Sequence, residues 1–147
     1  MDERLTELEA RVQRLEDREA IHALFMRYRQ CLDEKDFSGY ARLFAESGEF
    51  VAAAGTATGR AAIQELVDGM RGNLLTAVAG DDLHIVVNPD IHVADDHATA
   101  RSTWIYLTRG DDGEPTVAKV GHYEDELIRE DGEWRFARRF APIDMPA

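Results

Sequence analysis

Residues 117–141 have the sequence VAKVGHYEDELIREDGEWRFARRFA, and this stretch decides the fold class. Its two halves are rich in aromatic and branched apolar residues that alternate with polar ones, which is typical of β-strands. Asp131-Gly132 lies between the halves, and an Asp-Gly pair is a strong signal for a two-residue hairpin turn. The stretch therefore predicts two antiparallel strands, 117–129 and 134–141, joined by a tight turn.

The residues before this hairpin continue the same pattern. Residues 83–93 and 98–108 alternate with a period of two and predict two more strands, with a turn at Asp95-Asp96. Asn88-Pro89 interrupts the first of them, because proline lacks the N–H that a sheet ladder needs. The second half of the chain is therefore predicted to be an antiparallel meander.

The first half of the chain has the 3.6-residue period of helices. One helix is predicted over 17–33, a short one from 36 to 44, and a third over about 60–71, with a strand starting at Gly48. Helices that precede a run of strands indicate the α+β class, not alternating α/β. We see no linker or repeat, so we expect one domain over residues 1–147. The buried face of the 17–33 helix is predicted to consist of Ile21, Leu24, Phe25, Tyr28 and Leu32.

Residues 1–16 are predicted to form a separate N-terminal helix. Leu5, Leu8, Val12 and Leu15 make a narrow apolar stripe on an otherwise charged segment. Two heptads are too few for a stable isolated coiled coil. The stripe should therefore pack either on its own domain or on a second subunit.

Composition excludes several classes of partner. The 147 residues contain 29 acids against 17 lysines and arginines, a formal net charge of −12. This charge repels phosphate backbones and anionic lipid, so we expect neither nucleic-acid nor membrane binding. The N-terminus lacks the apolar core of a signal peptide, and the single cysteine, Cys31, cannot form an internal disulfide. A cytoplasmic protein is the expectation.

In its ordered motifs the chain resembles the SnoaL-like branch of the nuclear transport factor 2-like (NTF2-like) superfamily. The resemblance covers residues 17–141 and implies a cone-shaped fold, with N-terminal helices on a curved sheet around a deep pocket. That superfamily includes dehydratases, polyketide cyclases, isomerases, a dehydrochlorinase and non-enzymatic binding domains, so the fold does not fix the activity. The motifs are Arg18-Glu19-Ala20-Ile21, Tyr28 with Leu32-Asp33, Asp36-Phe37, Leu43-Phe44, Gly59 with Ile63, His84 with Asn88, Gly121 to Leu127, and Asp131 to Phe136.

Asp33 and His84 are the first candidate catalytic residues. Asp33 ends a predicted helix, where the helix dipole disfavours a carboxylate, so a purely structural role is less natural. His84 shares a strand face with apolar Val86 and needs a partner if buried, which a backbone carbonyl could also supply. The resemblance implies that the two residues pair in the pocket and that His84 is the general base. A carboxylate would fix the imidazole tautomer, leaving the other nitrogen to take a substrate proton.

Tyr28 is the third candidate catalytic residue. It shares the inward face of Phe25 and Leu32, and its phenol could donate to a substrate oxygen, although a core tyrosine is an equally ordinary role. Helical spacing alone places it about 140° around the helix from Asp33. The two come together only if the helix ends inside a cone.

Five residues are candidates for substrate binding. Alternation along the last strand places Arg139 on the face opposite Trp134 and Phe136, but the resemblance implies a pocket arginine that could stabilise an anion. An exposed arginine on the outer sheet face is the alternative. The other four candidates are His122 and three residues that share one strand face, Ser102, Trp104 and Tyr106. Large aromatic residues on an inward face more often pack in the core than contact a ligand.

One departure from the family bears on mechanism. Scytalone dehydratase has a second pocket histidine on the strand that corresponds to 98–108, and this chain has none there. His122 could substitute only if it points inward. No histidine pair has close metal-ligand spacing, and no phosphate loop or nucleophile elbow is present, so we expect neither a metal nor a cofactor.

The sequence is consistent with three alternative functions. The first is a cofactor-free lyase or isomerase acting on a small, apolar cyclic molecule, with His84, Asp33 and Tyr28 in the roles above. The second is a non-catalytic small-molecule-binding module of the same fold. The third is an assembly role for the N-terminal stripe. Because resembling proteins are commonly oligomers, we expect a homo-oligomer, either a dimer or a trimer.

Overall fold

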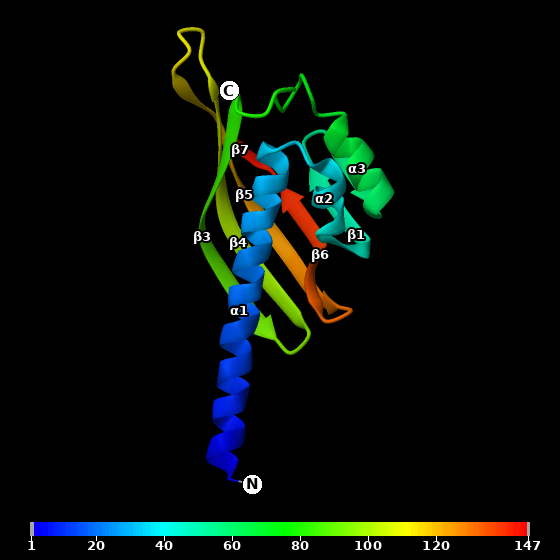
Figure 1. Ribbon diagram of the computed structural model, residues 1–147, viewed down its shortest axis with the longest axis vertical. Coiled ribbons are helices and arrows are strands. Elements are labelled where there is room, and N and C mark those ends of the chain that lie inside the picture. The colour runs from blue at the N-terminus through cyan, green and yellow to red at the C-terminus, as the bar shows by residue number, and fades with distance from the viewer. Residues whose placement is uncertain (1, 147) are drawn as a thin grey trace.

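The computed structural model describes residues 2–146 and shows helices packed against one face of a curved sheet (Figure 1). Two helices, α1 (Glu3–Asp33) and α2 (Phe37–Arg42), come first, followed by strands β1 (Phe44–Ala52) and β2 (Gly55–Thr58) and helix α3 (Arg60–Asp68). The remaining elements are all strands. They are β3 (Asp82–Ala94), β4 (His97–Arg109), β5 (Pro115–Glu130), β6 (Glu133–Ala141) and β7 (Ile143–Met145). The predicted α+β class is confirmed.

One sheet contains all seven strands, in the order β2-β1-β6-β5-β4-β3 with β7 beside β5. All pairings are antiparallel except β1 with β6. The four long strands of the predicted meander are present within a few residues of their predicted ends. The sheet curves around the second half of α1, with α2 and α3 closing the side (Figure 1).

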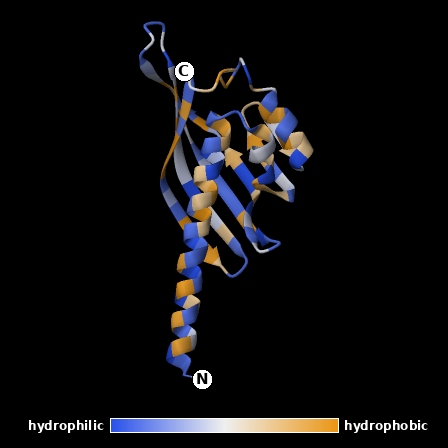
Figure 2. Cartoon of the chain, in the orientation of Figure 1, coloured by the Kyte–Doolittle hydropathy of each residue, from blue (hydrophilic) through white to orange (hydrophobic). Residues whose placement is uncertain are grey.

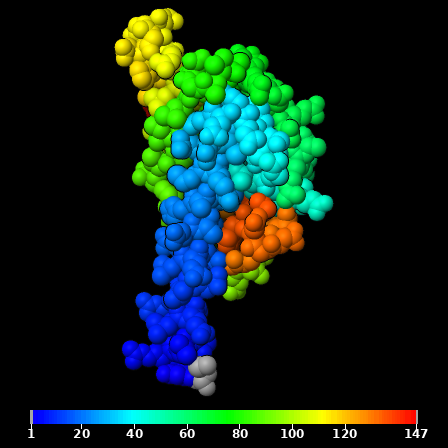
Figure 3. Space-filling view, in the orientation of Figure 1, coloured from blue at the N-terminus to red at the C-terminus, as the bar shows by residue number. Residues whose placement is uncertain are grey.

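Helix α1 is one continuous helix, so the prediction of two separate helices is wrong. The segment between Leu15 and Arg18 contains no glycine or proline that would break it. Asp17 marks the point where the helix meets the sheet: its buried Oδ1 accepts hydrogen bonds from Arg129 and from the indole of Trp134. Residues 3–16 are exposed throughout and extend beyond the sheet (Figure 3); we call them the arm.

The interruption of β3 at Asn88-Pro89 is confirmed. Pairing with β4 jumps from Val87 to Asp90, and Asn88 adopts a positive φ of 55°. Because Pro89 has no N–H to donate, the strand bulges there and the ladder then resumes.

A second bulge lies in β6, which makes the predicted faces of that strand wrong. Leu127 of β5 pairs with Phe136, but the preceding Glu126 pairs with Arg138, so Ala137 is an extra residue. The insertion shifts the alternation by one position. Arg139 therefore lies on the same buried face as Phe136, and it is neither opposite to it nor exposed.

Membrane-spanning helices are absent from residues 2–146. The one long helix, α1, is too rich in charge to cross a bilayer.

Candidate active site

A cavity of about 90 Å³ opens between the C-terminal half of α1 and the inner face of the sheet. Most of its lining is apolar, and His84, Lys119 and four tyrosines are its main polar groups. The segment after α3 contributes Met70, Leu74 and Leu75, and so covers one side. The arrangement is an apolar chamber with a few hydrogen-bonding groups, which is the usual form of a small-molecule site.

Asp33 and His84 meet at the wall of this cavity. Asp33 is the last residue of α1, and His84 is the third residue of β3. The Nδ1 of His84 lies 2.9 Å from Oδ1 of Asp33, and the backbone N–H of His84 donates to the same oxygen at 3.0 Å. Arg29, one turn earlier on α1, donates to Oδ2 at 3.1 Å. The exposed fraction is only 8% for the imidazole and 13% for the carboxylate.

This geometry determines which ring nitrogen of His84 can react. An ionised carboxylate only accepts hydrogen bonds, so Nδ1 donates its proton to Asp33 and the neutral ring keeps a free lone pair on Nε2. Within residues 2–146 no protein group hydrogen-bonds to Nε2. His84 is therefore held in the tautomer that can take a proton from a molecule in the cavity.

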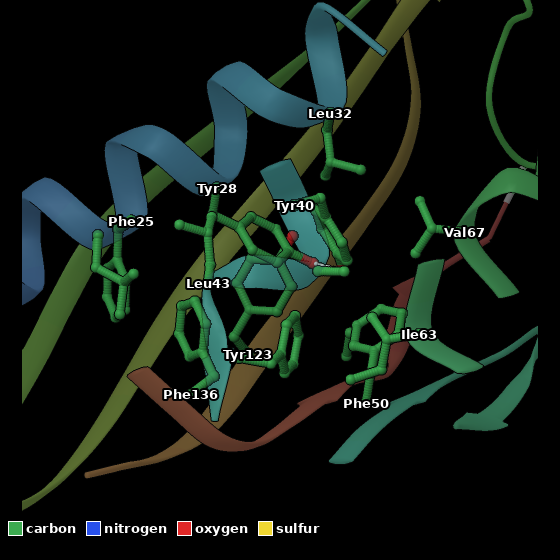
Figure 4. Close-up of a cluster of buried hydrophobic side chains, with 14 of the residues drawn as sticks. Phe25, Tyr28, Leu32, Tyr40, Leu43, Phe50, Ile63, Val67, Tyr123 and Phe136 are labelled. Atoms are coloured by element: carbon green, nitrogen blue, oxygen red, sulfur yellow. Dashed lines mark hydrogen bonds between the residues drawn. The ribbon is translucent and has the colours of Figure 1, made fainter. Parts of the chain in front are cut away.

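Tyr28 lies in a group of tyrosines next to this pair. Its hydroxyl is 2.7 Å from that of Tyr40 on α2, and Tyr123 of β5 packs edge-on against its ring (Figure 4). All three line the cavity. Burial raises the pKa of each phenol well above its usual value, so each stays protonated at neutral pH. The group can donate hydrogen bonds but cannot act as a base.

Tyr106 faces the cavity beside His84, with the two rings 4.8 Å apart. Its hydroxyl donates to Asp82, which also pairs with Lys35 at 2.6 Å and accepts the backbone N–H of Thr76. Burial alone would raise the pKa of Asp82, but these donors outweigh it and lower that pKa. Burial and the bond to Asp82 raise the pKa of Tyr106. Asp82 thus links three parts of the structure through these contacts: the end of α1, the cavity wall and the segment after α3.

Arg139 does not line the cavity. It is fully buried behind the tyrosines and forms a bidentate pair with Asp125, at 2.8 and 2.9 Å. Its guanidinium lies over four rings, at distances from 3.5 Å for Tyr123 to 5.0 Å for Phe25. Burial alone would lower the pKa of Arg139, but the carboxylate of Asp125 outweighs it, so the pKa is raised and the side chain stays charged.

The other predicted binding residues divide between two environments. Trp104 lines the cavity, and its indole donates to the carbonyl of His122. Ser102 is buried on the same strand face but does not line the cavity. His122 points outward from β5, because its ring is bonded to Asp144 at 2.7 Å and lies near Glu124. It therefore cannot supply the second pocket histidine.

Sequence reasoning missed Tyr40, Asp82 and Tyr123. Asp82 lies two residues before His84 on one strand, so the period of two places both on one face and could have revealed it. Tyr123 lies directly opposite Ser102 and could have been inferred from a strand register. Tyr40 is on a six-residue helix whose orientation no local pattern indicates.

In the part of the chain that the structure describes, no three His, Cys, Asp or Glu side chains are grouped as metal ligands would be.

Comparison with known proteins identifies the family. The family model of the SnoaL-like domain matches residues 13–140. No curated protein sequence matches the chain. Solved structures do, among them an NTF2-like protein with a cystatin-like fold from Novosphingobium aromaticivorans. That protein is 33% identical over 98% of this chain and 92% of its own, with a TM-score of 0.85.

Two further structures come from proteins with a lower identity to this chain. A proposed scytalone dehydratase from N. aromaticivorans is 27% identical over 90% of this chain and 87% of its own, with a TM-score of 0.72. A protein from Catenulispora acidiphila, solved in complex with S-DNPA, is 26% identical over 84% and 90%, with a TM-score of 0.71. Because the family model spans most of the sequence and the fold agrees, the chain belongs to the SnoaL-like domain family, with the NTF2-like fold.

Proposed function

We propose that this protein is a cofactor-free lyase or isomerase that works by general acid–base catalysis on a small, apolar cyclic molecule. The observation that supports the proposal most directly is the 2.9 Å hydrogen bond between His84 and Asp33 at the wall of an apolar cavity. Nε2 of His84 removes a proton from a carbon next to a substrate carbonyl, and Asp33 stabilises the imidazolium that forms.

The tyrosines would stabilise the charge that develops on the substrate. When the C–H bond breaks, negative charge moves to the carbonyl oxygen and gives an enolate. A protonated phenol in a dry site can donate to that oxygen, and Tyr28 stays protonated because burial raises its pKa. The His84 imidazolium then returns its proton, either to a β-hydroxyl, which leaves as water as the C–O bond breaks, or to another carbon of the enolate, so the same site supports elimination and isomerisation.

The lining supports an apolar substrate. Leucines, aromatic rings and alanines make up most of the chamber, whose volume of about 90 Å³ is below the range of roughly 300–1,000 Å³ usual for drug-sized ligands. A ring-sized molecule would therefore displace part of the segment that contains Leu74 and Leu75. Binding of S-DNPA by a relative from C. acidiphila supports a small-molecule ligand in the family.

Proton exchange tests the proposal without knowledge of the product. The protein is incubated in D₂O with a panel of cyclic ketones and β-hydroxyketones, and loss of the α-proton signal is followed by NMR. We expect exchange on at least one member of the panel, slowed about 100-fold or more by His84→Asn and by Asp33→Asn. His92→Asn is the matched control, because His92 is exposed and, within residues 2–146, pairs only with Asp90.

Two results would contradict the proposal. One is exchange that both variants retain within about threefold, since loss of a general base should cost far more. The other is a ligand that copurifies in the cavity, is identified by mass spectrometry and is returned chemically unchanged by the wild-type protein. That outcome would favour the non-catalytic binding module.

A further inference from the structure

The arm has an apolar stripe that its own domain leaves uncovered. Leu5, Leu8, Val12 and Leu15 are between 41% and 64% exposed, and they form a row of apolar residues along the free part of α1 (Figure 2). Residues 3–16 contain no buried position at all. Four large apolar side chains in a row on a helix that reaches out into solvent need a partner.

The direction of the stripe excludes the chain's own sheet as that partner. At 3.6 residues per turn, the stripe and the buried face of α1, which begins at Asp17 and Ile21, lie about 180° apart around the helix axis. The stripe therefore points directly away from the sheet. A second helix could lie along it while its own domain occupies the far side, so the two domains would not collide.

The residue types in the stripe fit a two-stranded coiled coil. With Leu5 at position a of a heptad, the seam residues are Leu5 and Val12 at a and Leu8 and Leu15 at d. One of the two a residues, Val12, is β-branched, and a β-branched residue at a combined with leucine at d favours two strands over three or four. Asp17 falls at position f, opposite the seam, which agrees with its burial against the sheet.

The charges beside the seam specify the occupant and its direction. All g positions are basic (Arg4, Arg11 and Arg18), and the e positions of the arm are acidic (Glu9 and Glu16). In a parallel pair, g contacts e of the next heptad on the partner, which joins Arg4 to Glu9 and Arg11 to Glu16. In an antiparallel pair, g would face g and e would face e, and both contacts would be repulsive. Within residues 2–146 none of these five side chains makes an ion pair.

We propose that the arm is a dimerisation element that pairs in parallel and in register with the arm of a second copy of this chain. The seam ends after Leu15, because the next a position is Glu19 and would place two carboxylates against each other. Pairing is therefore limited to two heptads. These suffice because the rest of α1 is already folded against the sheet, which removes the cost of nucleating the helix.

Sedimentation of the full chain tests the seam. We expect the mass of a dimer for the wild-type protein and loss of that dimer for Leu8→Asp combined with Leu15→Asp. Arg4→Glu with Arg11→Glu should weaken the dimer, and adding Glu9→Arg with Glu16→Arg should restore it, since the g-to-e attraction is re-formed with its signs reversed. Arg14→Glu, at the outward c position, is the matched control and should change nothing.

Cysteine crosslinking tests the direction. In a Cys31→Ser background, Leu8→Cys should form a disulfide-linked dimer on mild oxidation, whereas Gln13→Cys, at an outward position, should not. Crosslinking between Leu8→Cys and Val12→Cys chains, without crosslinking of Leu8→Cys to itself, would indicate an antiparallel pair and overturn the proposal. A monomeric wild-type protein at about 100 µM, or a dimer that survives the aspartate variant, would also overturn it.

Discussion

Replacing Arg139 by Met would isolate a buried charge in the centre of the core. The side chains of Arg139 and Asp125 are both fully buried, and the methionine is close enough in length to fill the space between the rings. The carboxylate of Asp125 would lose both of its hydrogen bonds from the guanidinium. Removing one partner of a buried pair costs about 3–5 kcal/mol, so we expect the free energy of unfolding to fall by about 4 kcal/mol. For a domain of this size, the Tm would fall by roughly 10 °C.

Urea denaturation followed by circular dichroism measures the change, and a double variant gives the control. In Arg139→Met with Asp125→Leu neither position carries a charge, so most of the lost stability should return. The single variant should also depend on pH. Burial raises the pKa of Asp125, so the folded state holds the proton more tightly than the unfolded chain does. The defect should therefore be small below about pH 4 and should grow as the pH rises.

The reasoning is refuted if Arg139→Met lowers stability by less than about 1 kcal/mol, or if the double variant is no more stable than the single one. Either result would mean that the aromatic rings alone hold this part of the core and that the ion pair contributes little.

Three other predictions follow from buried groups. All four tyrosines have a raised pKa, so tyrosinate absorbance should stay absent near pH 10 and appear only with alkaline unfolding. The free energy of unfolding should be retained below the ordinary tyrosine pKa and should fall as the pH rises above it. Gly121→Ala should lower stability by about 3 kcal/mol in thermal melts, because the added methyl group would overlap the ring of Trp104. Asp82→Asn should lower the free energy of unfolding by about 3 kcal/mol at pH 7, because buried Lys35 loses its partner. Because the pKa of Asp82 is lowered in the folded protein, this difference should shrink as the pH falls below about 4.

The general plan of the fold could be predicted because its signals are local. Helical spacing located the buried face of α1, and Asp131-Gly132 located the β5–β6 turn, where Asp131 and Gly132 both have positive φ. The proximity of Asp33 and His84 could not come from spacing, since 51 residues separate them. It came from the resemblance to the SnoaL-like family, and the structure shows the two residues in contact.

The parts that could not be predicted depend on partners distant in the sequence. The inserted residue Ala137 is recognisable only from the register of β6 against β5, and without it Arg139 is placed on the wrong face. Likewise, a charged side chain looks like a surface residue until its counter-charge is located, and Asp125 lies on the neighbouring strand. The continuity of α1 through Asp17 was missed because the apolar residues before Asp17 lie on one face of the helix and those after it lie on the opposite face.

The bulge at Asn88-Pro89 has a consequence for solubility. Strand β3 is the long free edge of the sheet, with 13 residues, and an unprotected edge of that length would invite other chains to add strands and aggregate. Pro89 removes one donor from the edge, the bulge breaks its straight line, and Asp33 occupies the N–H of His84. At the opposite border β2 has only four residues. Neither edge strand therefore offers a long, straight row of free backbone groups, so self-association by addition of strands to the sheet is disfavoured.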